Sequence, residues 1–363
     1  MKYDKWVWLF LVAITVFTGC DNSPENKPKE PESTFIEIRA ADVSFLPEIR
    51  EANVPFKNKS GEVQDVLTIL KAAGCNTIRL RLWHTPESGR SGLEEVSEFA
   101  SEIKTKGFKL WVTLHYSDTW ADPGSQTKPA LWNSLSLGNL TDSVYNYTKK
   151  VTTLLAPDFI QVGNEINDGF LWPEGKISTN QATYITLLQE GVRGVRDASA
   201  NTKIMLHFAG INGADWFYSL AKTHAVDYDI IALSYYPRWH EKSLSVVKNT
   251  LTQLVNNHNK DIILAETGYP FTLDWNDWTN NLVGLSDHLV SDYPATEKGQ
   301  RDFMMQLRKI MAETNRGLGL AYWAPEWVAY KGEQATDGSS WENMALFDFE
   351  FKALDAIEVF EDE

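Results

Sequence analysis

Two glutamates follow apolar runs that would carry their carboxyl groups to one edge of a sheet. Glu165 ends the segment 160–165 (IQVGNE), and Glu266 ends the segment 262–266 (IILAE). Each run has the length and apolar character of a buried strand, so the strand itself would place its glutamate at the rim. A single glutamate after a strand is commonly a solvated loop residue. Two of them, with Asn164 directly before the first, indicate a shared site.

Two neighbouring carboxyl groups meet the chemical requirement for hydrolysis of a glycosidic bond. One group protonates the leaving oxygen, and the other attacks the anomeric carbon or activates a water molecule. A separation of about 5–5.5 Å gives retention of configuration, and a separation of about 6.5–9.5 Å gives inversion. The sequence is compatible with both outcomes.

The two carboxyl groups must also differ in protonation. The acid needs a raised pKa, from an apolar wall or from the neighbouring anion, whereas the nucleophile stays ionised beside a guanidinium. Arg79, which lies in another apolar run, is the candidate for that guanidinium. Its alternative role is an ion pair inside the fold with no part in catalysis.

Strand-like and helix-like segments alternate from Ile36 onward, as in a parallel sheet with crossover helices. The expected strands are Ile36–Ser44, Asn76–Trp83, Lys109–His115, Phe159–Asn164, Lys203–His207, Ile230–Ser234, Asp261–Ala265 and Gly319–Trp323. Amphipathic stretches between them include Glu62–Ala73, Leu93–Lys106, Asp142–Leu155, Asn180–Ala198, Leu244–Asn257 and Thr296–Thr314. Eight such units favour an α/β fold made of a single (β/α)8 TIM barrel over a doubly wound open sheet, which usually has fewer strands.

The active site of such a barrel lies at the carboxyl ends of its strands. Polar and aromatic residues do gather at the expected strand ends: Asp42, Arg79, Arg81, Trp83, His115 to Trp120, Asn164, Glu165, His207, Tyr235, Tyr236, Glu266 and Trp323. A purely structural barrel has no need of this distribution, so it favours a site at that face.

The composition excludes nucleic acid and favours sugars as binding partners. The formal net charge is −15, and a surface of that sign repels polyanions, so nucleic acid is excluded as a partner. The 14 Trp residues offer flat faces that suit sugar rings, although any one of them is as readily a core residue. Cys20 and Cys75 do not look like a pair, and no disulfide is expected.

The N-terminus has the organisation of a bacterial export signal. Lys2 and Lys5 precede an apolar run from Trp6 to Phe17, and Thr18-Gly19-Cys20 follows. This ending resembles a lipobox, whose cysteine is acylated and becomes the mature N-terminus. The alternatives are a plain secretory signal and a retained anchor.

These features divide the chain into three parts. We expect a lipoprotein signal peptide over residues 1–19, the lipidated Cys20 with a proline-rich flexible tether over 20–33, and a catalytic domain over 34–363. The lipid makes the membrane a partner of the protein. It also predicts an exported protein anchored to the cell envelope, at the outer membrane or the cell surface.

Seven short stretches carry a resemblance to a known family. They are RLRLW (79–83), HYSDTWADP (115–123), VGNEI (162–166), LWPEG (171–175), SYYP (234–237), ETGYP (266–270) and YWAPEW (322–327). Together they resemble glycoside hydrolase family 53, the endo-β-1,4-galactanases of the retaining (β/α)8 clan A. The resemblance implies an enzyme that cleaves internal β-1,4 bonds of galactan or type I arabinogalactan. No cofactor is expected to be required, and we expect a monomer because nothing in the sequence suggests an obligate partner.

The resemblance also implies a role for individual residues. Glu165 would be the acid/base and Glu266 the nucleophile, with Asn164 bonded to the 2-hydroxyl of the sugar. Further contacts are implied for seven residues: Arg79 and either Tyr235 or Tyr236 would orient Glu266, Trp323 would lie beneath the sugar, and His115, Asp118 and Trp120 would line the cleft.

Some segments depart from the family pattern. His84-Thr85-Pro86 and Phe208-Ala209-Gly210 differ from the expected motifs and put subsite contacts in question rather than the reaction. The loop after the seventh strand holds Asp274, Asp277 and Asp287, and some bacterial members bind calcium there. Oxygen ligands suit calcium, and the alternative is a solvated acidic loop.

Two other functions stand beside galactan hydrolysis. A mannanase or xylanase of the same clan would share both glutamates, but we would not expect it to carry the run from His115 to Pro123. A surface lipoprotein that only binds glycans would have no need of two carboxyl groups at the strand ends.

Overall fold

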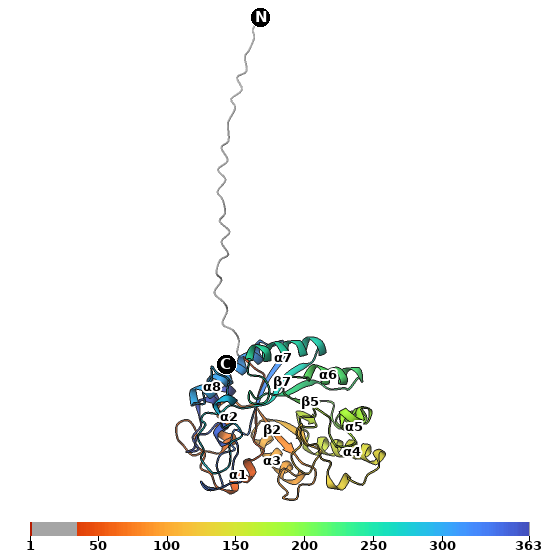
Figure 1. Ribbon diagram of the computed structural model, residues 1–363, viewed down its shortest axis with the longest axis horizontal. Helices are drawn as coiled ribbons and strands as arrows, with labels where there is room; N and C mark the ends of the chain where they lie inside the picture. The colour runs from red at the N-terminus through yellow and green to blue at the C-terminus, as the bar shows by residue number, and fades with distance from the viewer. Residues whose placement is uncertain (2–34, 363) are drawn as a thin grey trace. The chain divides into compact units, whose positions relative to one another are not determined.

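A closed barrel of parallel strands forms the centre of the computed structural model, which describes Met1 and residues 35–362. Within these residues eight strands pair in chain order, and β8 pairs with β1. Figure 1 shows strands in the middle of the folded part, with helices beside them. They are β1 (Ile38–Asp42), β2 (Thr77–Leu82), β3 (Lys109–Leu114), β4 (Phe159–Val162), β5 (Lys203–Ala209), β6 (Ile230–Ser234), β7 (Asp261–Thr267) and β8 (Gly317–Trp323). The predicted TIM barrel is confirmed, with strand ends that differ from the prediction by a few residues.

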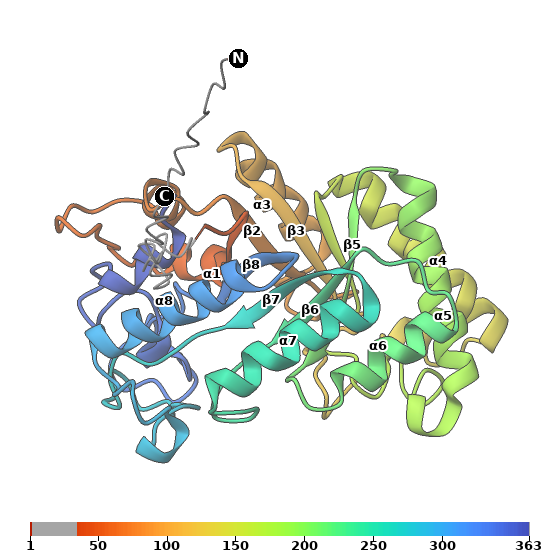
Figure 2. The same cartoon turned by 90° about the horizontal axis from the view of Figure 1, so that it is seen from above.

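The helices lie around the outside of the strands (Figure 2). In the described chain they are α1 (Leu46–Glu51), α2 (Val66–Ala72), α3 (Leu93–Thr105), α4 (Leu137–Leu155), α5 (Ile177–Ala198), α6 (Ala214–Thr223), α7 (Leu244–His258) and α8 (Glu297–Glu313). Short 3₁₀ helices cover Ala130–Trp132, Ser286–His288, Glu342–Met344 and Asp355–Phe360.

Capping side chains explain two helix starts that the periodicity misplaced. The Asp65 side chain accepts the backbone N–H of Leu67, so α2 begins at Val66 rather than near Glu62. The Ser136 side chain likewise accepts the N–H of Asn139, so α4 begins at Leu137 rather than Asp142.

Apolar side chains close the lower part of the barrel interior. The buried cluster there includes Ile38, Ala40, Trp111, Phe159, Met205, Ile230, Ile263 and Ala321. A second and larger cluster fills the space between strands and helices. Above this packed layer, buried polar side chains such as Asp42, Asn164 and Glu266 lie at or just beyond the carboxyl ends of their strands.

Barrel closure depends on one glycine in β8. Gly319 has φ +143°, and a Cβ atom there would lie 1.9 Å from the carbonyl oxygen of Ile38. The approach of β8 to β1 therefore requires the absence of a side chain at this position.

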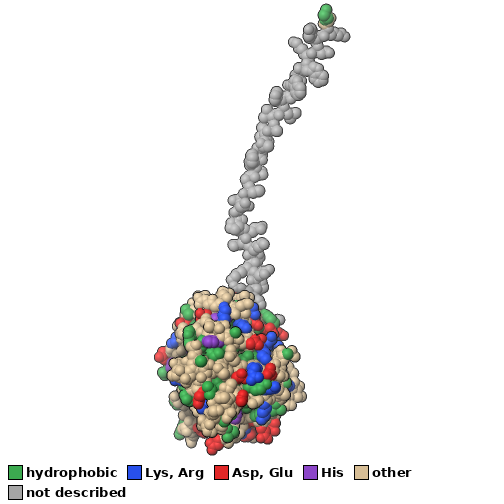
Figure 3. Space-filling view, turned by 90° about the vertical axis from the view of Figure 1, so that its right-hand side faces the viewer, with side chains coloured by type: hydrophobic (Ala, Val, Ile, Leu, Met, Phe, Trp, Pro, Cys, Tyr) green, Lys and Arg blue, Asp and Glu red, His purple; other side chains and the backbone are tan. Residues whose placement is uncertain are grey.

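The outer surface carries charges of both signs. Figure 3 shows basic side chains among acidic ones on the face that includes α4 and α5. On α5, Arg193 pairs with Glu190, and Arg196 pairs with Asp227 and Asp229. No helix of the described residues is long and apolar enough to cross a membrane. The predicted signal peptide, Cys20 and the tether lie outside the described part apart from Met1.

Candidate active site

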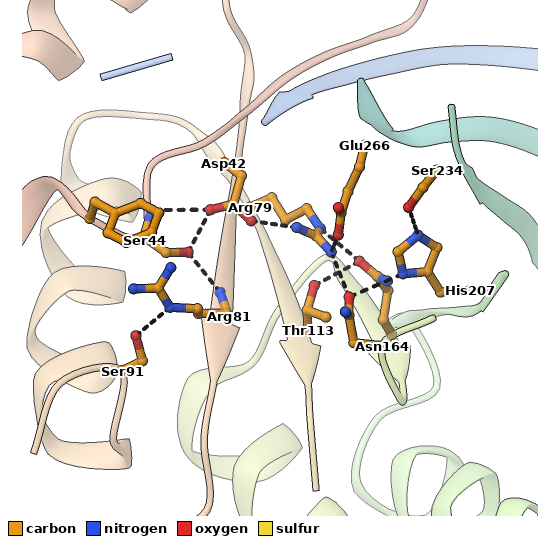
Figure 4. Close-up of polar contacts among 12 residues, drawn as sticks. Asp42, Ser44, Arg79, Arg81, Ser91, Thr113, Asn164, His207, Ser234 and Glu266 are labelled. Carbon is orange, nitrogen blue, oxygen red and sulfur yellow. Dashed lines mark hydrogen bonds and ion pairs between the residues drawn. The ribbon is translucent and has the colours of Figure 1, made fainter. Parts of the chain in front are cut away.

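Arg79 connects the carboxyl ends of four strands. Its guanidinium donates to Asp42 Oδ2 at 2.5 Å, to Gln161 Oε1 at 2.8 Å, to Asn164 Oδ1 at 3.1 Å and to Glu266 Oε1 at 2.7 Å (Figure 4). Only 1% of Arg79 is exposed. The fixed fork of donors therefore holds Asn164 and Glu266 in one geometry without competition from water.

Glu165 reaches the site through an unusual backbone. Gly163 and Glu165 both have positive φ, +95° and +47°. A side chain at Gly163 would place its Cβ 2.5 Å from Ile166 Cγ2. The turn after β4 therefore needs glycine, and it directs the Glu165 carboxyl inward, where Oε1 accepts the Ser234 hydroxyl at 2.5 Å.

The two glutamates lie close together. Carboxylate oxygens of Glu165 and Glu266 approach within 4.8 Å of each other. Burial, together with the charge of Glu266, raises the pKa of Glu165 to about 8, so this group holds a proton at neutral pH. Burial also raises the pKa of Glu266 above its usual value, and the adjacent Arg79 offsets part of this rise. The environment thus favours an acid at Glu165 and an anion at Glu266.

Of the two tyrosines expected beside Glu266, only Tyr236 reaches it. The Tyr236 hydroxyl lies 3.5 Å from Glu266 Oε2. Tyr235 is directed away from the site, and its hydroxyl donates to the carbonyl oxygen of Glu241 at 2.5 Å. Adjacent residues leaving a strand have side chains on opposite faces, which explains the difference.

A cleft of about 580 Å³ opens above the carboxyl groups. Its walls are largely aromatic and include Trp120, Tyr236, Trp239, Trp323, Trp327 and Trp341, with Arg79, Arg81, His115, Asn164, Glu165, His240, Leu282 and Glu266 among the other lining residues. Trp323 packs edge-on against Trp341 with 4.9 Å between ring centroids, and Trp239 lies parallel to Trp341. Such a wall suits the apolar faces of sugar rings.

Three predicted residues from the segment after β3 have different positions. Trp120 and His115 line the cleft, and His115 Nδ1 accepts the N–H of Ala121 at 3.1 Å. Asp118 is not among the lining residues. Its carboxylate accepts the N–H groups of Thr85 and Ala130, so it ties two loops together.

Some lining residues were not predicted. Trp239 and His240 follow β6, Leu282 follows β7, and Trp327 and Trp341 follow β8. All five belong to loops, where no periodicity indicates which way a side chain points. For the three Trp residues the sequence signal is a high density of Trp after strand ends, which cannot separate cleft residues from core residues.

Asp274 and Asp277 of the predicted calcium loop accept hydrogen bonds from different groups. Asp274 is exposed and accepts the Thr272 hydroxyl. Asp277 is buried, and its two oxygens accept the N–H groups of Thr279 and Ser339. Among the described residues no group of three His, Cys, Asp or Glu side chains gathers in this loop. Calcium binding in this loop therefore stays a prediction.

Comparisons with known proteins point to one family over most of the chain. A family model described as glycosyl hydrolase family 53 matches residues 38–360. A probable arabinogalactan endo-β-1,4-galactanase A of Neosartorya fischeri is 36% identical over 335 residues, covering 87% of this chain and 90% of the relative. Arabinogalactan endo-β-1,4-galactanase A of Aspergillus niger is 34% identical over 348 residues, covering 91% and 96%. The solved GH53 catalytic domain of Ignisphaera aggregans has a TM-score of 0.84 at 36% identity, covering 92% and 97%.

Proposed function

The chain belongs to glycosyl hydrolase family 53, and from this we propose that it is a retaining endo-β-1,4-galactanase acting on galactan and type I arabinogalactan. The observation that carries the retaining mechanism is the approach of carboxylate oxygens of Glu165 and Glu266 within 4.8 Å. Retaining enzymes have carboxyl groups about 5–5.5 Å apart, and inverting enzymes need about 6.5–9.5 Å to admit water.

The proposed reaction has two steps. Glu266 attacks the anomeric carbon while the bond to the leaving oxygen breaks, and Glu165 gives its proton to that oxygen. The product is a glycosyl ester on Glu266 and an ionised Glu165. A water molecule then attacks the anomeric carbon, Glu165 takes its proton, and Glu266 leaves as a carboxylate. Both glutamates return to their initial protonation states.

Other residues of the cleft would bind the sugar. We assign to Asn164 the contact with the 2-hydroxyl, since its amide is held between Arg79 and the carbonyl oxygen of Ala121. Trp323, whose ring lines the cleft, would form the floor beneath the sugar on the non-reducing side. The proposed chemistry uses no cofactor. Calcium in the loop after β7 stays a prediction, which thermal unfolding with and without a chelator would test.

The galactan specificity draws on relatives. Those named arabinogalactan endo-β-1,4-galactanase match about nine tenths of this chain at 33–36% identity. Reducing-sugar release from linear β-1,4-galactan, with mannan and xylan as controls, tests the specificity. Cleavage of a control polymer instead would indicate another clan A specificity, and binding of galactan without cleavage would indicate a glycan-binding protein.

Azide distinguishes the roles of the two glutamates. On an aryl β-galactobioside with a good leaving group, a Glu165→Ala variant still forms the ester on Glu266, so azide should release a β-glycosyl azide. A Glu266→Ala variant leaves the opposite face open, so azide should give an α-glycosyl azide. The reverse pairing of variants and products would exchange the assigned roles. Absence of rescue in both folded variants would contradict the mechanism.

We also propose lipid anchoring at Cys20, from the sequence alone, with export to the cell envelope. Growth of an expressing bacterium with labelled palmitate should label the full chain and should leave a Cys20→Ala variant unlabelled. Equal labelling of both chains would contradict the proposal.

A further inference from the structure

Three hydrogen bonds form a closed ring that begins and ends on Glu165. The Ser234 hydroxyl lies 2.5 Å from Glu165 Oε1. Nε2 of His207 lies 2.9 Å from Ser234 Oγ, and the backbone N–H of Glu165 points at His207 Nδ1 at 3.2 Å. Figure 4 shows His207 between Ser234 and Asn164. Both Ser234 and His207 are fully buried, so water does not take part.

The position of the single proton on the His207 imidazole determines which atom donates and which accepts in each of these hydrogen bonds. Burial, with the charge of Arg79 and the nearby His115 and His240, holds the pKa of His207 well below its usual range. The imidazole of His207 is therefore neutral and carries one N–H. If the Ser234 hydroxyl donates to Glu165, Ser234 Oγ must accept from Nε2–H, and Nδ1 is left as the acceptor for the Glu165 N–H.

The other tautomer of His207 has a different consequence. Nδ1–H would donate to Asn164 Oδ1, 3.1 Å away, and Nε2 would accept the Ser234 hydroxyl. Ser234 Oγ would then accept a proton carried on Glu165 Oε1. That proton would face Ser234 and not the leaving oxygen in the cleft. Asn164 Oδ1 also has a donor already, the Arg79 guanidinium.

We infer that Ser234 and His207 are positioning residues that keep Oε1 of Glu165 an acceptor and so hold its exchangeable proton on Oε2. Among the described residues Oε2 has no hydrogen-bond partner, and it is accessible to solvent. Since Glu165 lines the cleft, a proton on Oε2 is available to a bound substrate. The proton leaves and returns through Oε2 in the two steps, and the Ser234 proton stays in place. This inference rests on the proposed acid/base role of Glu165.

The pH dependence of Glu165 reflects groups on several strands. Glu266 of β7 and Asp122 in the loop after β3 raise its pKa, whereas Arg79 of β2 lowers it. Tyr236, which follows β6, also lies within electrostatic range. Among these neighbours Ser234 supplies the hydrogen bond that lowers the pKa of Glu165. Loss of the Ser234 hydroxyl should therefore raise that pKa further.

A Ser234→Ala variant tests the positioning role by kinetics. The alkaline limb of kcat/KM should move to higher pH, because the acid keeps its proton longer. With an activated aryl galactobioside, the second step should slow by on the order of 10-fold, giving a burst, because a smaller fraction of Glu165 is ionised and able to act as the base. A Thr148→Ala control deletes a hydroxyl that is equally buried but lies on α4. The Thr148→Ala variant should change neither the alkaline limb nor the rate of the second step. If the alkaline limb of Ser234→Ala also stays where it is in the parent protein, the inference is overturned.

The tautomer of His207 is measured without any activity. In ¹⁵N-histidine-labelled protein, the His207 signals, assigned with a His207→Asn variant, should show a protonated Nε2 and an unprotonated Nδ1 at pH 6. The opposite tautomer would overturn the inference and leave the proposed function intact. Failure of galactan cleavage would instead overturn the proposed function, so the two failures are distinguishable.

Discussion

Glu266 lies beside a guanidinium, whereas Glu165 has only neutral donors within hydrogen-bond distance. The Arg79 nitrogen is 2.7 Å from Glu266 Oε1, and the Ser234 hydroxyl is 2.5 Å from Glu165 Oε1. At so short a range, and with little water, a formal charge stabilises an anion far more than a hydroxyl does. Two glutamates in one cleft are thereby suited to different tasks, Glu165 to that of the acid and Glu266 to that of the nucleophile.

Replacement of Arg79 by lysine tests this electrostatic assignment. Lysine keeps the charge but cannot bond Asp42, Gln161, Asn164 and Glu266 together. We expect kcat to fall by on the order of 100-fold. The acid limb of the pH profile should move to higher pH, because Glu266 loses the bonded cation that lowers its pKa and ionises later. A reduced kcat with an unmoved acid limb would contradict the assignment, and thermal unfolding checks that the variant is folded.

Residue types at strand ends predicted the two reacting groups and the guanidinium beside Glu266, but not the partner of Glu165. Glu165, Glu266 and Arg79 could be identified because each is a charged residue in or directly after a buried run. The contact of Ser234 with Glu165 could not, because a serine at a strand end is common and the contact joins residues 69 positions apart. Asp118 was misplaced for a similar reason, since one of its partners, Thr85, lies in the loop after β2 and the other, Ala130, lies twelve positions further along its own loop.

At the scale of elements, the end of β6 determines which tyrosine meets the nucleophile. Tyr235 and Tyr236 follow Ser234 directly, and the alternation of side chains directs one hydroxyl to Glu241 and the other to Glu266. The sequence shows that the two side chains point to opposite faces, but it does not show which of them points toward the site. That choice is set by pairing with β7, whose register shifts near Ser234.

The two tyrosines form a matched pair for mutation. Tyr236→Phe should lower kcat about 10-fold, because it removes a hydrogen bond to a charged group. Tyr235→Phe loses a bond to a neutral carbonyl and should cost about 1 kcal/mol of stability while leaving kcat unchanged. Measured kcat and urea unfolding of both variants separate the effects. A larger loss of kcat in Tyr235→Phe would show that the wrong tyrosine has been assigned.

Strands were more predictable than the loops that complete the cleft. Each strand is a short apolar run, so all eight appear in the sequence pattern. Helix α6 (ADWFYSLAKT) was not among the predicted stretches, because aromatic residues at half of its early positions obscure its polar face. The loop residues Trp239 and Trp341 are placed by contacts with each other, which no local pattern contains.

Over the whole molecule, several carboxyl groups are buried without a cation bonded to them. Burial raises the pKa of Glu326 to about 8, although one of its oxygens accepts the N–H of Phe45 at 3.1 Å. Burial raises the pKa of Glu342 to about 7. A folded state that keeps protons which the unfolded chain loses must become less stable as pH rises. The barrel therefore combines a negative net charge with internal acids that favour mildly acidic conditions.

Glu326 allows this dependence on pH to be measured at one position. Its folded pKa of about 8 lies above the unfolded value of about 4.3, so its stabilisation is complete below pH 4.3 and is lost as pH rises toward 8. Glu326→Gln keeps the acceptor for Phe45 but cannot ionise. Its melting temperature should therefore fall less between pH 5 and pH 8 than that of the parent protein, by a few degrees.

Glu358 provides the control of opposite sign. Burial would raise the pKa of its carboxyl, but hydrogen bonds from Lys59 and Arg301 hold it below the usual range. Its stabilisation is present above the unfolded pKa and is lost only as pH falls through the folded value. Glu358→Gln should therefore lower the melting temperature by a similar amount at pH 5 and pH 8. If Glu326→Gln shows the same slope with pH as the parent and Glu358→Gln, Glu326 is ionised in the folded protein and the account of buried acids is wrong.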